Sequence, residues 1–180
     1  MNILFKHKIL NPLMLKTILP LLITLMLSIA AKAQQADSTL KKSPIKTLSD
    51  KKFTQLITGE YLFDDIEQVA RLNHYPMPDA VLKFKKELSL SPVQLTKITA
   101  IAAELHRKRV EMGNFIVTNE TTLDKLMRKG TDNGSIIFYA NRSGLYYGEL
   151  RNAILQACLS TGNALAPQQI TKLETLTAHN

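Results

Sequence analysis

The chain has 180 residues, of which 45% are hydrophobic, 21% charged and 6% aromatic, and its formal net charge is +8. This length allows one compact domain, with or without a processed segment. A single cysteine excludes a disulfide framework within the chain and any cysteine-based zinc finger. Seven glycines and seven prolines exclude collagen-like and low-complexity classes, and the apolar fraction is that of a folded domain.

Residues 1–33 have the three parts of a secretory signal peptide. Three lysines give a basic start, and residues 17–31 then form a run of 15 residues without a charge. Ala31 and Ala33 supply the small-x-small pattern at which signal peptidase cleaves. We therefore predict export to the periplasm with cleavage after Ala33. The alternative is a retained anchor, although a span needs about 20 apolar residues.

The charge of the exported protein is lower than that of the whole chain. Residues 1–33 hold four lysines and no acid, so cleavage leaves 19 basic and 15 acidic residues and a charge of +4. Such a charge gives a mild preference for anionic partners and does not predict nucleic-acid binding.

Residues 34–58 are predicted to form a disordered polar linker. The first part is rich in lysine and serine, contains Pro44 and lacks a sustained apolar period. Such a stretch cannot bury enough surface to offset its ordering entropy. Residues 59–76 are predicted to hold one short helix, because apolar side chains recur at helical spacing between 62 and 70. Two prolines spaced two residues apart then break the pattern.

The start of a long helix is the clearest local signal in the chain, in the sequence LSPVQL. Ser91 is predicted to be the N-cap that accepts a hydrogen bond from the amide of Gln94. Gln94 is placed to reach back to the amide of Ser91, which completes a capping box. Pro92 suits the first helical position, and Leu90 and Leu95 stand at the two positions of a hydrophobic staple.

A second helix start, in the sequence LAPQQI, repeats this device 75 residues later. Gln169 is retained, and Leu165 and Ile170 again stand at the staple positions. Ala166 stands in the place of the capping serine. Because alanine has no side-chain oxygen to accept a hydrogen bond, this helix start is less stable by about 1 kcal/mol.

From Pro78 the pattern predicts four helices, of which the two long ones form an antiparallel hairpin. The predicted helices are 78–88, 92–129 and 135–161, followed by a short last helix. At 1.5 Å per residue the first long helix would be about 57 Å long. Apolar residues alternate in steps of three and four along both long helices, which is typical of a coiled-coil-like seam. The predicted seam is Leu95, Ile98, Ala102, Leu105, Arg109, Met112, Ile116, Asn119, Leu123 and Leu126, facing Ile137, Ala140, Gly144, Tyr147, Arg151, Ile154, Cys158 and Leu165.

Glycines interrupt both long helices. Gly113 on the first and Gly144 and Gly148 on the second lie at similar distances from the turn, which fits a shared bend. Close helix–helix approach at Gly144 and Gly148 fits equally well. The runs 115–118 and 136–139 have strand-like composition, but the heptad register passes through both and favours helix.

These features together resemble the Spy/CpxP family, also called the LTXXQ-motif family, which includes periplasmic heavy-metal sensors similar to ZraP and CnrX. The resemblance covers residues 77–178, within a predicted hairpin domain of residues 77–180. It implies an all-α, boomerang-shaped hairpin with short flanking helices that dimerises antiparallel into a curved cradle. It also implies an envelope-stress role, as an ATP-independent chaperone for unfolded proteins or as a regulator that binds a sensor kinase. The matching motif residues are Leu90, Ser91, Gln94, Leu165, Ala166 and Gln169.

Apolar positions off the seam predict a homodimer independently of this resemblance. A helix that is apolar on more than one face needs a second partner surface. Packing against the short helices is the alternative use of the same area. These positions are Ile101, Val110, Phe115, Val117 and Met127 on the first long helix and Phe138, Leu145, Leu155 and Leu159 on the second.

The chain shows no pattern of an enzyme, a cofactor site or a metal site. It lacks a Ser/His/Asp set, a phosphate loop and any His-x-x-x-His or Cys-x-x-Cys pair, and the adjacent Asp64 and Asp65 diverge on a helix. His106 lies among basic residues, which disfavours a cation. Cys158 is predicted to be a core residue, and an intermolecular disulfide is the alternative. A heavy-metal sensor and a purely structural envelope protein remain alternative functions.

Five residues of the first long helix are candidate contacts for an unfolded client. Arg107, Lys108 and Arg128 carry charge that would steer acidic clients, and Met112 and Phe115 supply adaptable apolar contact. A solvated basic face is the alternative for the three cations.

Overall fold

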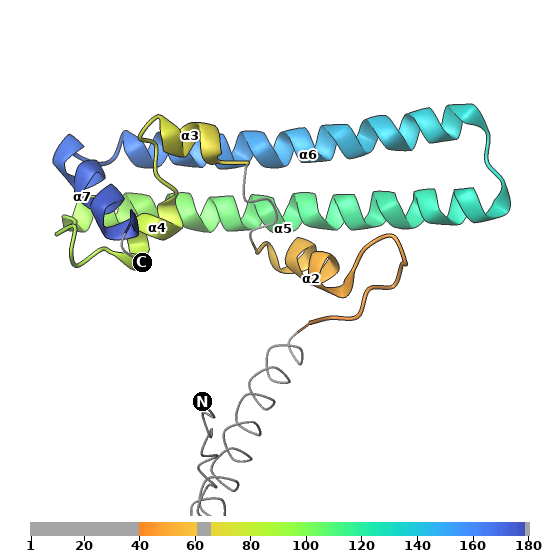
Figure 1. The fold of residues 1–180 in the computed structure, drawn as a ribbon, viewed down its shortest axis with the longest axis horizontal. Helices are drawn as coiled ribbons and strands as arrows, with labels where there is room; N and C mark the ends of the chain where they lie inside the picture. The colour runs from red at the N-terminus through yellow and green to blue at the C-terminus, as the bar shows by residue number, and fades with distance from the viewer. Residues whose placement is uncertain (1–39, 61–65, 179–180) are drawn as a thin grey trace, which may run out of the picture. The chain divides into compact units, whose positions relative to one another are not determined.

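A computed structural model of the protein describes residues 40–60 and 66–178, and the unit that begins at Lys41 is all-helical (Figure 1). The predicted signal peptide and its cleavage site lie outside the described residues. No strand occurs in either described range, so the runs 115–118 and 136–139 are helical as predicted. None of the described helices is both long enough and apolar enough to cross a membrane. The helices are α2 (Asp50–Thr58), α3 (Gln68–Leu72), α4 (Pro78–Lys83), α5 (Pro92–Lys129), α6 (Asn133–Gly162) and α7 (Pro167–Ala178).

The long helix α5 begins at the predicted capping box. The Ser91 hydroxyl accepts a hydrogen bond from the Gln94 amide at 3.2 Å, and the Ser91 amide donates to Gln94 Oε1 at 3.0 Å. The return helix α6 begins two residues before the predicted start, because Asp132 acts as its N-cap and accepts from the Ser135 amide at 2.9 Å. Hydrogen bonds from Ser135 hold the pKa of the Asp132 carboxyl below its usual value. Local capping chemistry therefore sets both starts.

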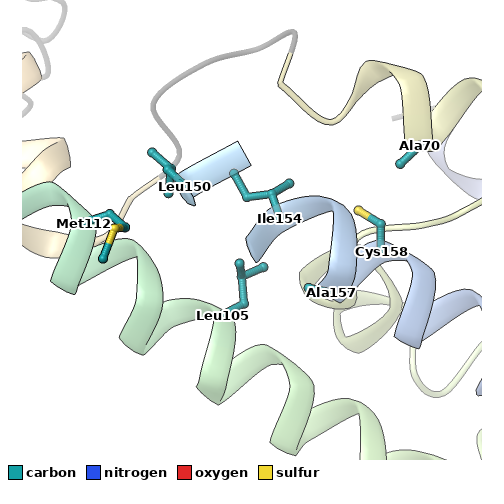
Figure 2. Close-up of a cluster of buried hydrophobic side chains, with 7 residues drawn as sticks. All are labelled: Ala70, Leu105, Met112, Leu150, Ile154, Ala157 and Cys158. Carbon is teal, nitrogen blue, oxygen red and sulfur yellow. The ribbon is translucent and has the colours of Figure 1, made fainter. Parts of the chain in front are cut away.

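The two long helices pack antiparallel along the seam predicted for α5. Figure 2 shows Leu105 and Met112 of α5 facing Leu150, Ile154 and Ala157 of α6. All of these side chains are buried. The polar seam residues Arg109 and Asn119 are also buried. The Asn119 Oδ1 atom has no hydrogen-bond partner among the described residues, but the side-chain NH2 group of Asn119 is satisfied. This group donates to the Tyr139 carbonyl at 3.0 Å and to Ser143 Oγ at 2.8 Å. The buried α5 positions are Ile98, Leu105, Arg109, Met112, Gly113, Ile116 and Asn119.

The seam predicted for α6 is wrong over its first half. Ile137 and Arg151 are exposed, and the line buried toward α5 includes Leu150 and Ala157 instead. The reason is that the side of α6 that carries Ser143 faces α5, because Asn119 donates to Ser143 Oγ and to the Tyr139 carbonyl. Up to Leu150 the line facing α5 therefore runs one residue before the predicted one. Cys158 packs in a cluster with Ala70 of α3, so α6 buries apolar residues on a flank as well as toward α5 (Figure 2).

The prediction of a disordered linker over 34–58 is wrong for its last part, because residues 50–58 form α2. Leu56 is fully buried, in a cluster with Ile45, Leu48 and Ile116. The Ser49 hydroxyl caps the helix by accepting from the Lys52 amide at 3.2 Å. The segment is too polar to fold by itself, and α5 supplies the apolar surface that α2 needs.

Gly113 lets the backbone of α2 lie directly against α5. A Cβ atom at this position would lie 1.8 Å from the Leu56 carbonyl oxygen. The close approach predicted for Gly144 and Gly148 is not observed, because a Cβ atom at either would meet nothing within 4 Å. The helices α5 and α6 each run without interruption through their glycines.

Residues 66–91 form short elements that cover one end of the hairpin, whereas residues 61–65, where the prediction places the start of the short helix and where Asp64 and Asp65 stand, lie outside the described residues. The short helix predicted within 59–76 is present as α3, and the break follows it. The helix predicted over 78–88 ends at Lys83, because its C-cap Phe84 leaves the helical conformation with a φ of −105° and a ψ of 24°. The chain then turns back at Ser89, which has a φ of 50°. Val81, Phe84 and Leu88 are buried against Ile98 of α5 and Leu173 of α7 in a separate cluster.

An ion pair between the buried Arg109 and the exposed Asp79 connects α4 to the middle of α5. Arg109 is only 7% exposed, and its Nη1 lies 3.1 Å from Asp79 Oδ2. The Nε and Nη2 atoms of Arg109 are buried without a hydrogen-bond partner among the described residues. Removing a guanidinium from water is costly, and one partly exposed carboxylate offsets only part of that cost. The pair therefore fixes the position of α4 more than it stabilises the fold.

Candidate functional site

The two motif glutamines interlock where the starts of α5 and α7 meet. Gln94 Nε2 donates to Gln169 Oε1 at 2.8 Å, and Gln169 Nε2 lies 3.3 Å from Gln94 Oε1. Each side chain also holds a neighbouring loop, since Gln94 Nε2 donates to the Ala164 carbonyl and Gln169 Nε2 to the Leu88 carbonyl. The repeated motif is thus a structural joint between segments 75 residues apart.

The second motif keeps half of its capping box despite the missing hydroxyl. The Ala166 amide donates to Gln169 Oε1 at 2.9 Å, as the Ser91 amide does to Gln94 in the first motif. Leu165 and Leu90 both pack against the cluster that contains Val81 and Leu173. The motif residues therefore position the helices α5 and α7 relative to each other.

A groove of about 500 Å³ runs between α5 and α6 and is lined by these two helices alone. Its floor is apolar, with Leu105 and Met112 of α5 facing Ala153 and Ala157 of α6. Nothing from α2, α3, α4 or α7 lines it, so it is a part of the hairpin that the short helices leave uncovered. The lining residues are Lys97, Ala100, Ile101, Glu104, Leu105, Lys108 and Met112 from α5 and Glu149, Asn152, Ala153, Gln156, Ala157 and Ser160 from α6.

The α5 rim of the groove carries charges that largely neutralise one another. Arg107 Nη2 lies 2.7 Å from Glu104 Oε1, and Arg107 Nη1 lies 3.1 Å from Glu111 Oε2. Lys108 Nζ lies 3.2 Å from the same oxygen of Glu111. The hydrogen bond from Arg107 lowers the pKa of the Glu104 carboxyl. The basic face predicted here is therefore a network of exposed ion pairs that offers little net charge to a client.

The structure brings together some of the predicted client contacts and separates others. Lys108 and Met112 both line the groove, although Met112 is buried in its floor and offers only its exposed edge. Phe115 lies three residues further along α5 and is 43% exposed. Arg107 is exposed beside the rim without lining the groove. Arg128 lies near the far end of α5 and pairs with Asp124 at 2.8 Å.

A cluster of aromatic rings and one arginine lies next to the groove, and we name it the aromatic–arginine cluster: Phe115, Phe138, Arg142 and Tyr146. The rings of Phe115 and Tyr146 stack with their centroids 5.3 Å apart. The Arg142 guanidinium lies 5.2 Å from the centroid of Phe138 and 5.5 Å from that of Tyr146. Arg142 Nε donates to the Tyr146 hydroxyl at 3.1 Å, and Nη2 donates to the same oxygen.

The half of the hairpin near the turn exposes further apolar side chains. No described helix other than α5 and α6 accompanies it there (Figure 1). Two helices alone cannot bury apolar residues that point away from their mutual seam. Of the off-seam residues predicted to seek a partner, Val110 and Val117 lie against the α2 segment. The exposed ones near the turn are Phe115, Met127, Phe138 and Leu145, to which the structure adds Ile136 and Ile137. Leu159 is also exposed, but it lies near the other end of α6, beside the α3 segment.

The histidine and cysteine side chains that the structure describes do not gather into a site. His74 Nδ1 lies 2.7 Å from Glu174 Oε1 on an exposed surface, and His106 is exposed on α5. Within residues 40–60 and 66–178, no group of three or more His, Cys, Asp or Glu side chains is placed to hold a metal ion. Cys158 is buried and free, its Sγ lies 3.3 Å from Met77 Sδ, and burial raises its pKa to about 11. It is a core residue in this structure, as the sequence predicts.

Several residues of the candidate site do not follow from the helical pattern alone. Ala153 and Gln156 line the groove only because no short helix covers them. The sequence does contain a pattern that predicts the contacts of Phe138, Arg142 and Tyr146. Residues four apart meet on one face of a helix, and an arginine between two aromatic residues at this spacing is typical of cation–π contact. This spacing does not predict whether another part of the chain covers that face of the helix.

No family model, no curated protein and no solved structure matches this chain.

Proposed function

We propose that this protein is an exported, ATP-independent chaperone that holds partly unfolded proteins against the α5–α6 hairpin. The observation that carries the proposal is the uncovered apolar groove of about 500 Å³ between the two long helices. The resemblance of the two glutamine motifs to the Spy/CpxP family supports it, since members of that family act in this way. The exported location is part of the proposal and rests on the predicted signal peptide.

The groove suits transient binding of apolar segments of many sequences. Burying a leucine or phenylalanine side chain contributes about 1.5–3 kcal/mol, and one groove of this size takes only a few such side chains. Met112 contributes an unbranched, polarisable side chain that adapts to different shapes. Weak and adaptable contact of this kind needs no nucleotide to release the client, because dissociation is already fast.

The exposed apolar residues near the turn support a homodimer as the working form. Met127, Ile137 and Leu145 are more than half exposed, beyond the reach of the short helices. A second copy that covers them would leave the groove residues of each chain to clients. The same surface would serve a sensor-kinase domain if the protein acts as a stress regulator.

A charge placed on the groove floor should weaken client holding. The purified chain is expected to suppress aggregation of a thermally unfolding client at near-stoichiometric ratios without ATP, measured by light scattering. Ala153→Glu buries a carboxylate among apolar side chains and is expected to cost at least about 1 kcal/mol of client affinity. This corresponds to roughly fivefold more protein for the same suppression.

Ala140→Glu is the matched control for this variant. It makes the same substitution on the same helix at an exposed position that does not line the groove. Its suppression is expected to equal that of the unmodified chain. Absence of suppression at several-fold excess of the unmodified chain would refute the chaperone function, and equal loss in both variants would refute the groove as the binding site.

A further inference from the structure

We infer that the aromatic–arginine cluster binds a carboxylate of the client, so that the preferred clients are segments in which Asp or Glu lies close to large apolar side chains. This inference rests on the proposed chaperone function and assigns it a client class. The cluster and the groove belong to the same two helices. Phe115 follows Met112 by three residues, and Tyr146 precedes Glu149 by three, so one extended segment can contact both.

The charge of Arg142 lacks a counter-charge within the described protein. Arg107, Arg109 and Arg128 each have a carboxylate oxygen within 3.1 Å. Arg71, Arg142 and Arg151 form no ion pair in the described part of the chain, and of these three only Arg142 contacts aromatic rings and a phenol oxygen there. A guanidinium has five N–H donors. The Tyr146 hydroxyl oxygen accepts one hydrogen bond from Nε and one from Nη2. Donors therefore remain for an external acceptor.

The contacts of Arg142 also hold it in a defined orientation before any client binds. Phe138 and Tyr146 stand four residues before and after it on α6, and their rings lie against its guanidinium. Fixing an arginine side chain in advance lowers the entropy that binding must supply. A planar, oriented guanidinium matches a carboxylate with two parallel hydrogen bonds, which a lysine ammonium cannot reproduce.

The rings around Arg142 supply the apolar part of the recognition. Phe138 is 52% exposed, and Phe115 stacks on Tyr146 with nearly half of its own surface exposed. Aromatic and arginine side chains that stand together are the residue types that dominate binding energy at protein interfaces. Arg142 thus binds the carboxylate of the client, and the aromatic rings contact the leucine or phenylalanine next to it.

Charge complementarity favours an acidic protein segment over a nucleic acid. The +4 charge expected after cleavage and the paired ions on the groove rim do not form the continuous basic patch that a phosphate backbone requires. A single oriented cation among apolar rings instead suits one carboxylate with apolar neighbours.

A pair of peptides tests this inference on the purified full chain. Two dansyl-labelled 15-residue peptides of leucine, phenylalanine and serine would differ only at one central position, which is Glu in the first and Gln in the second. Fluorescence anisotropy is expected to show about tenfold tighter binding of the Glu peptide, as a charge-assisted pair adds roughly 1.4 kcal/mol. Arg142→Lys is expected to remove most of this preference, because lysine keeps the charge and loses the fork and the ring contacts.

Arg151→Lys is the matched control, since Arg151 is exposed on the same helix and lies outside the groove and the cluster. It should leave the tenfold preference unchanged. Equal binding of both peptides to the unmodified chain would overturn the inference, while aggregation suppression would leave the chaperone function in place. Binding of neither peptide, together with no suppression, would reject both. If Arg142→Lys changed the sedimentation of the chain and not its peptide preference, the cluster would be a self-association surface and the inference would fail.

Discussion

Gly113→Ala is expected to destabilise the protein by about 2–4 kcal/mol, although alanine is the better helix former. The added Cβ atom would lie 1.8 Å from the Leu56 carbonyl oxygen and 2.6 Å from its carbonyl carbon, so the backbone of α2 must move. Overpacking costs about 1–3 kcal/mol, and partial loss of Leu56 burial adds to it. The gain in helix propensity offsets only about 1 kcal/mol.

Urea unfolding followed by circular dichroism measures this change, and hydrogen exchange at the amides of α2 locates it. Gly144→Ala and Gly148→Ala are the matched controls on α6, since a Cβ atom there meets nothing within 4 Å. Each control is expected to stabilise the protein by roughly 0.5–1 kcal/mol through helix propensity. A stabilising Gly113→Ala would show that α2 does not pack on α5 as described.

Gln94→Ala and Gln169→Ala are each expected to cost about 2–3 kcal/mol. Gln94 bonds to the Ser91 amide, the Ala164 carbonyl and Gln169, and its loss leaves partly buried polar groups without partners. The two side chains form one network, so the double variant should lose about 1 kcal/mol less than the sum of the single losses.

The same unfolding measurement, arranged as a double-mutant cycle, gives the coupling between the two glutamines. Gln168→Ala is the control, because Gln168 is the exposed neighbour of Gln169 on α7. It is expected to change the free energy of unfolding by less than about 0.5 kcal/mol. Strictly additive losses from Gln94→Ala and Gln169→Ala would mean that the motifs cap two helices separately and do not join them.

The long helices were predictable from the sequence because their signals are local. The capping box at Ser91 and the glycine after Lys129 mark both ends of α5, and the observed bounds agree with the predicted ones. The buried positions of α5 follow its three-and-four spacing, including the polar Arg109 and Asn119. Capping and periodicity act within a few residues, so they are visible without knowledge of the tertiary structure.

The parts that the sequence did not predict depend on distant partners. The segment that contains Leu56 is polar, and its burial requires Ile116 and Gly113, which lie about 60 residues away. The line of α6 that faces α5 is set by contacts across the hairpin, such as those of Asn119 with Ser143 and the Tyr139 carbonyl, and apolar spacing within α6 does not reveal them. The groove exists because the short helices leave one part of the hairpin open, which spacing within a single helix cannot reveal.

Photocross-linking at the groove tests the central claim most directly. A photoreactive phenylalanine analogue at Gln156, which lines the groove, is expected to capture an unfolded client under conditions of aggregation suppression. The same analogue at Arg151, exposed on α6 outside the groove, should capture little. Capture at Arg151 equal to or greater than that at Gln156 would contradict the assignment of the groove as the client-binding site.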